Sequence, residues 1–157
     1  MSCAVLLAAS LLMADPVASA QTPAPVPASI AAEPLYADIV LRAQGLKQIV
    51  DGWIAEGAAQ DAAFARRPDF AEFSAGITDL AARDMAGHVD LRERNTDGDL
   101  KCILRGLAED IPLKLNALAE AEAPQARAEA LSDLAYLLDD NAAVILAPPA
   151  PATVPAS

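Results

Sequence analysis

Histidine, cysteine and aromatic residues are scarce in this sequence of 157 residues, which has one histidine, two cysteines and an aromatic content of 4%. A closed zinc site takes four ligands, and His and Cys are too few here to supply them. The sequence also contains no G-x-S-x-G, H-E-x-x-H or C-x-x-C-H motif and no glycine-rich phosphate-binding loop. We therefore expect a protein that is not an enzyme and that carries no cofactor.

Basic residues are few as well. There are 11 Lys and Arg residues against 22 Asp and Glu residues, which gives a formal net charge of −11. A surface of this charge repels nucleic-acid phosphates and anionic lipid headgroups. The composition therefore predicts no nucleic-acid partner and no binding to a membrane surface, whereas a cationic partner or a metal ion stays compatible with it.

Strand signals are absent, and the sequence favours helix. It is rich in alanine, poor in β-branched and aromatic residues, and shows no run of alternating apolar and polar residues. Apolar residues instead recur at steps of three and four in four segments. These segments begin near Pro34, Asp69, Thr96 and Pro124, and short links join them. We predict an all-α fold, an antiparallel four-helix bundle over residues 34–146.

The third segment has the clearest pattern. Thr96 and Asp99 have the spacing of a capping box, in which the threonine hydroxyl accepts a hydrogen bond from a free amide of the first turn. Pro112 interrupts the segment and predicts a kink or a brief break. Cys102 lies off the apolar stripe, so its side chain is predicted to face away from the core. The stripe itself consists of Leu100, Ile103, Leu104, Leu107, Ile111, Leu115 and Leu118.

The N-terminal 20 residues resemble an export signal. An apolar run over 4–14 is followed by an Ala-x-Ala cleavage site at 18–20, although no basic residue precedes the run. The run is too short to span a bilayer as a helix. We expect a signal peptide over 1–20 and a bacterial periplasmic or secreted protein that keeps no membrane span after cleavage. Cleavage would remove Asp15 and no basic residue, which changes the formal net charge from −11 to −10.

Proline and alanine dominate the segments on either side of the predicted bundle. Residues 21–33 read as an extended linker and residues 147–157 as a tail of the same character. We predict that both are disordered.

Loss of the signal peptide would leave one cysteine. Cys3 lies within the signal, so Cys102 would have no partner in its own chain. An odd cysteine in a secreted protein suggests intermolecular pairing or a free thiol. We predict a non-enzymatic binding or assembly module whose partner is another protein or a second copy, with a homodimer linked through Cys102 as the specific hypothesis.

A second hypothesis assigns the function to Asp84 and His88. These residues stand one turn apart where the second apolar stripe becomes polar, so they could present a carboxylate and an imidazole to a small ligand or a metal. The alternative is a hydrogen-bonded Asp–His pair with a structural role. Met85 and His88 are too close on one helix to clamp a haem iron from both sides, which leaves only a five-coordinate haem on His88.

The acidic turn at 95–99 invites comparison with a calcium loop. With Gly98 at the sixth position, oxygen ligands fall at the first, third and fifth positions, but Leu104 falls at the twelfth, where a bidentate glutamate is required. The turn is better interpreted as a helix link with an acidic cap.

Overall fold

The computed structural model describes residues 29–148, which form a bundle of four long helices without a strand in that range. The helices are α1 (Pro34–Ala55), α2 (Pro68–Arg94), α3 (Gly98–Glu120) and α4 (Pro124–Leu146). Their bounds follow the predicted segments closely, and the predicted all-α four-helix bundle is confirmed. The predicted signal peptide lies outside the described residues, as do most of the linker and the tail.

Three short 3-10 helices complete the described chain: η1 (Ile30–Ala32), η2 (Ala58–Gln60) and η3 (Phe64–Arg66). Ile30 is buried, and η1 contacts both α1 and α4. The packed part of the chain therefore begins four residues before Pro34, the predicted start of the bundle.

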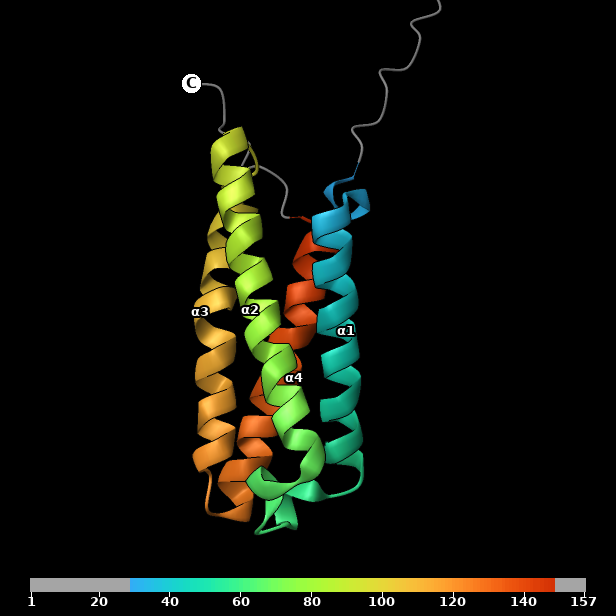
Figure 1. Cartoon of the computed structure of the whole chain (residues 1–157), viewed down its shortest axis with the longest axis vertical. Helices are drawn as coiled ribbons and strands as arrows, with labels where there is room; N and C mark the ends of the chain where they lie inside the picture. The colour runs from blue at the N-terminus through green and yellow to red at the C-terminus, as the bar shows by residue number, and fades with distance from the viewer. Residues whose placement is uncertain (1–28, 149–157) are drawn as a thin grey trace, which may run out of the picture.

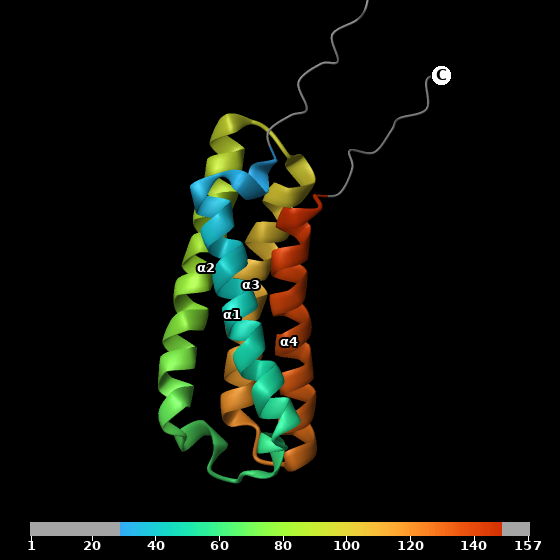
Figure 2. The same cartoon turned by 90° about the vertical axis from the view of Figure 1, so that its right-hand side faces the viewer.

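The helices run alternately down and up, so neighbours in sequence are antiparallel neighbours in space (Figure 1). The helix α1 lies beside α2 and α4, and α3 also lies beside α2 and α4. The helices α2 and α4 are thus on opposite sides of the bundle (Figure 2). Residues 29 and 148 lie at the end where α2 joins α3, which we call the upper end. The α1–α2 connection and the α3–α4 turn form the lower end.

Proline sets three of the four helix starts. Pro34, Pro68 and Pro124 each occupy the first turn, where the missing amide hydrogen costs nothing and the fixed φ suits a helix. Arg67 is the N-cap of α2, and the helix begins at Pro68, one residue before the predicted start near Asp69. Asp69 lies in the first turn, and its carboxylate accepts from Trp53 Nε1 at 3.0 Å and from the Arg67 guanidinium.

The turn between α2 and α3 differs from the predicted capping box. Asn95 ends α2 in the left-handed region at φ 51°, a conformation that asparagine tolerates better than most residues. The N-cap of α3 is Asp97 at φ 44°, and no side chain caps the helix. The Thr96 hydroxyl lies 3.4 Å from Asp97 Oδ2. The capping box is therefore wrong, because Asp97 and not Thr96 occupies the N-cap position.

Pro112 does not break α3, which runs as one helix from Gly98 to Glu120. The proline removes the amide that would bond to the Ala108 carbonyl. Ile111 and Leu115 are both buried on either side of it, so packing holds the two halves in one helix. Of the two predicted alternatives, the brief break is wrong and the kink stays a prediction.

The core is formed by the apolar stripes of all four helices, with large buried side chains supplied mostly by leucine and isoleucine. Phenylalanine and tryptophan are gathered at the lower end. Trp53 stacks edge-on against Phe64 and Phe73, with ring centroids 5.1 and 4.7 Å apart, and Phe70 lies against Phe64. This aromatic cluster fixes the α1–α2 connection, including η3, onto the ends of the helices. Among residues 29–148, no helix has the length and apolar character needed to cross a membrane.

At the upper end, a fully buried tyrosine ties α1 to α2. The Tyr36 hydroxyl donates to Asp90 Oδ2 at 2.6 Å and lies 3.3 Å from the Gly87 carbonyl oxygen. Burial and the bond to Asp90 raise the pKa of Tyr36. Arg94 completes the network, since its guanidinium bonds to both carboxylate oxygens of Glu33 and to Asp90.

We expect Tyr36→Phe to lower the free energy of unfolding by about 1–2 kcal/mol, because it removes the donor that joins α1 to the Asp90 carboxylate. Tyr136→Phe is the matched control. Tyr136 is 69% exposed, so this substitution removes the same hydroxyl group without breaking a buried hydrogen bond. Urea unfolding followed by circular dichroism measures both. Equal stabilities of the two variants would contradict the role given to Tyr36.

Candidate functional site

The two residues of the ligand hypothesis, Asp84 and His88, have different partners. Asp84 is fully buried and accepts a hydrogen bond at 2.6 Å from Nδ2 of Asn141, which is also fully buried. His88 is partly exposed, and its Nδ1 lies 2.8 Å from the carbonyl oxygen of Lys101 on α3. The predicted hydrogen-bonded Asp84–His88 pair is therefore wrong.

No group of three or more His, Cys, Asp and Glu side chains within residues 29–148 is placed to hold a metal ion. Asp84 faces the centre of the bundle and His88 faces α3, so the two ligands of the hypothesis diverge. A metal or small ligand at Asp84 and His88 stays a prediction. Leu104 of α3, which stands at the twelfth position in the calcium-loop comparison, is fully buried in the core, which agrees with its place on the predicted apolar stripe.

The Asp84–Asn141 bond crosses the bundle from α2 to α4 through the core. Each residue has one further oxygen, Oδ1, that is buried without a hydrogen-bond partner. Burial raises the pKa of Asp84 to about 7, and the bond from Asn141 opposes this rise. A neutral carboxylic acid can donate from Oδ1 of Asp84 to Oδ1 of Asn141, which would give both unpaired oxygens a partner.

Cys102 is exposed on the outer side of α3, and the prediction that it faces away from the core is confirmed. It has no disulfide within residues 29–148. The thiol is thus accessible to another molecule, and the intermolecular disulfide stays a prediction.

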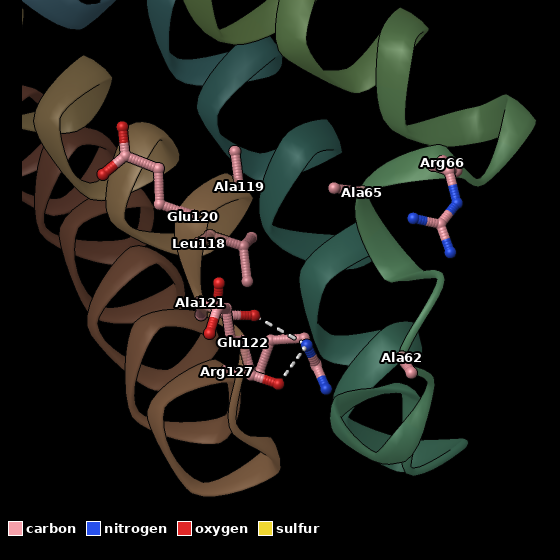
Figure 3. A pocket seen from close by; sticks show the side chains of 9 residues that line it. All are labelled: Ala62, Ala65, Arg66, Leu118, Ala119, Glu120, Ala121, Glu122 and Arg127. Carbon is pink, nitrogen blue, oxygen red and sulfur yellow. Dashed lines mark hydrogen bonds between the residues drawn. The ribbon is translucent and has the colours of Figure 1, made fainter.

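A pocket of about 510 Å³ opens at the lower end, between the α1–α2 connection and the α3–α4 turn (Figure 3). One part of its wall is small and apolar, formed by Ala62 and Ala65 from the connection and by Leu118 and Ala119 from the end of α3. Its volume is within the range of small-molecule sites in proteins. The aromatic cluster holds this wall in place, because Phe64 belongs to η3 and packs against Trp53.

The charged part of the wall contains two arginines, Arg66 from η3 and Arg127 from the first turns of α4. Figure 3 shows these two side chains on opposite sides of the pocket, with the Glu120 carboxylate pointing away from it. Glu122 also lines the pocket, and both glutamates are exposed.

Arg127 is only 4% exposed, and two of its three guanidinium nitrogens donate to backbone carbonyls. Nε donates to Ala59 at 2.8 Å, and Nη1 donates to Ala121 at 2.6 Å and to Glu122 at 3.3 Å. These bonds join η2 to the α3–α4 turn and satisfy carbonyls at the end of α3, where a positive charge is favourable. Nη2 has no hydrogen-bond partner among residues 29–148, and no carboxylate there forms an ion pair with Arg127.

Neither Arg127 nor Asn141 was among the predicted site residues. A signal for both exists in the sequence. Arg127 stands four residues before Leu131, and Asn141 stands between Leu138 and Ile145 at helical spacing, so both lie on the inner stripe of α4. A polar residue on an inner stripe needs a partner in the core, and that requirement marks both positions.

No protein family, curated protein or solved structure in the comparisons matches this chain.

The raised pKa of Asp84 predicts that stability falls with rising pH. The folded state holds this proton up to about pH 7, whereas the unfolded chain releases it near 3.8. The stabilisation is therefore fully present below the unfolded value and is lost as the pH rises to about 7. Over that range, the shift corresponds to about 4 kcal/mol in the free energy of unfolding.

Asp84→Asn removes this titration, so its unfolding free energy should fall less between pH 4 and pH 8 than that of the wild type. Asp110→Asn removes the same charge from an exposed position of α3 and should keep the wild-type pH profile. Urea unfolding across this pH range measures all three proteins. Parallel profiles for wild type and Asp84→Asn would contradict the assignment.

Proposed function

We propose that this protein is an exported, non-enzymatic binding module that takes up a small ligand in the pocket at its lower end. The observation that carries the proposal is Arg127, a side chain only 4% exposed that lines the pocket and has no anionic partner in the described chain. A buried charge is stable when it is paired, and carbonyl oxygens supply hydrogen bonds without supplying the opposite charge. A bound ligand can supply it.

The composition of the pocket supports binding rather than chemistry. Its walls are formed by alanine, leucine, arginine and glutamate side chains. The groups with the chemistry of a nucleophile or a buried acid lie elsewhere, Cys102 on the outside of α3 and Asp84 in the core. The proposed export rests on the apolar run and the Ala-x-Ala site near the start of the sequence.

A ligand in this pocket should shift the backbone amide resonances of Ala62, Ala65 and Ala119 in a ¹H–¹⁵N correlation spectrum. The measurement uses a panel of small anionic, neutral and cationic compounds, each added alone to the purified protein. The amides of Leu41 and Gly45, on the exposed side of α1, serve as internal references and should not move. A panel in which no compound moves the pocket amides in a saturable manner would contradict the proposal.

A second candidate function, assembly through Cys102, is favoured by the exposure of that side chain on α3. Two copies would form one S–S bond as their thiols give up two protons and two electrons to a thiol–disulfide oxidant. We expect oxidised glutathione to convert the purified protein to a dimer on a non-reducing gel, and dithiothreitol to reverse it. Cys102→Ser is the control and should stay monomeric. A wild-type protein that yields only monomer, or a monomeric mixed disulfide with glutathione, would contradict this candidate.

A further inference from the structure

We propose that the ligand of the lower pocket is a short organic carboxylate, held between the guanidinium groups of Arg66 and Arg127. This inference rests on the proposed function and adds the chemical class of the ligand. It is carried by the distribution of paired and unpaired basic side chains, by the hydrogen-bonding capacity left on Arg127, and by the composition of the pocket wall.

Unpaired basic residues are concentrated at this pocket. All 11 basic residues lie within residues 29–148, and seven of them form ion pairs with carboxylates there. The four without such a pair are Arg66, Arg92, Lys101 and Arg127, and two of these four line the same pocket. The pocket wall carries two arginines and two glutamates, Glu120 and Glu122, so its formal charge is zero, whereas acidic residues outnumber basic ones by two to one in the whole sequence. The pocket is therefore less negative than the protein as a whole.

The two arginines can share one carboxylate. Nε and Nη1 of Arg127 are engaged by carbonyls, so this side chain can offer a ligand only the two N–H groups of Nη2. The Arg66 side chain is exposed and forms no hydrogen bond or ion pair within the described residues, so its whole planar fork is free. A carboxylate has two oxygens with several acceptor sites, and charge-assisted bonds to guanidinium are the strong ones.

The rest of the pocket indicates an organic anion rather than a bare inorganic one. Ala62, Ala65 and Ala119 and the side chain of Leu118 give it a small apolar wall beside the arginines. A hydrocarbon part of a few carbons can cover this wall. The glutamates at the rim, Glu120 and Glu122, disfavour a ligand of high negative charge, and a monocarboxylate carries the least.

Titration of the purified protein with butyrate, followed at the pocket amides by NMR at fixed pH and ionic strength, tests this inference. Butyrate should bind saturably, and Arg66→Gln should weaken it about tenfold or more, as expected for the loss of a charge-assisted hydrogen bond. Arg92→Gln is the matched control: Arg92 is also exposed and without an ion pair in the described chain, but it lies near the upper end of α2. It should leave the dissociation constant unchanged.

Arg66 is the better residue to change because Arg127 also holds the lower end together. Correlation spectra of Arg66→Gln that overlay those of the wild type away from the pocket establish that its fold is kept. Glu122→Gln supplies a variant of opposite effect, since removing an acidic group from the wall should tighten butyrate binding.

The ligand panel separates the failure of this inference from the failure of the proposed function. Butyramide has the same hydrocarbon part without the charge, and inorganic phosphate has the charge without the hydrocarbon part. Binding of butyramide as tight as that of butyrate, or of phosphate alone, would overturn the carboxylate assignment and leave a ligand-binding pocket. Equal losses in Arg66→Gln and Arg92→Gln would overturn the assigned contact. A pocket that responds to no compound would overturn both proposals.

Discussion

An arginine side chain that is largely removed from water needs acceptors, and in this bundle Arg127 finds them on three backbone carbonyls. Those carbonyls belong to segments that are far apart in sequence, the α1–α2 connection and the α3–α4 turn. One side chain thereby joins both chain reversals at the lower end, and the pocket between them exists because of that join. The arrangement satisfies hydrogen bonds on the guanidinium without neutralising its charge, and this difference is what makes the lower end a candidate for ligand binding.

The core of the bundle handles its other polar groups differently. Asp84 and Asn141 form one hydrogen bond between α2 and α4, and one oxygen of each side chain has no donor. Burial therefore favours the neutral form of Asp84. Tyr36 instead donates to the half-buried carboxylate of Asp90 and stabilises its charged form, so this bond lowers the pKa of Asp90. The stability of the fold therefore depends on pH through the central pair. The upper network instead favours the ionised forms of Asp90 and Arg94.

Helical periodicity was sufficient to predict the fold, because side chains such as Ile111 and Leu115 recur at steps that put them on one face whatever surrounds the helix. It was not sufficient for the helix ends, where the backbone of the turn decides which residue caps, as Thr96 shows. The site depends on contacts between distant segments. The pairing of Asp84 with Asn141 depends on how far α2 and α4 are shifted along the bundle axis. The contact of Arg127 with Ala59 depends on the path of the α1–α2 connection. A local sequence pattern contains neither piece of information.

An even number of antiparallel helices brings residues 29 and 148 to the same end of the molecule, and the pocket lies at the other (Figures 1 and 2). Each helix has 22 to 27 residues, so a rise of about 1.5 Å per residue separates the two ends by about 35 Å. Any attachment made through residue 29 or residue 148, whether to a surface, a fusion partner or a tether, therefore leaves the pocket on the far side and open to solution. The molecule is polar in the geometric sense: one end is suited to attachment and the other to contact with its surroundings.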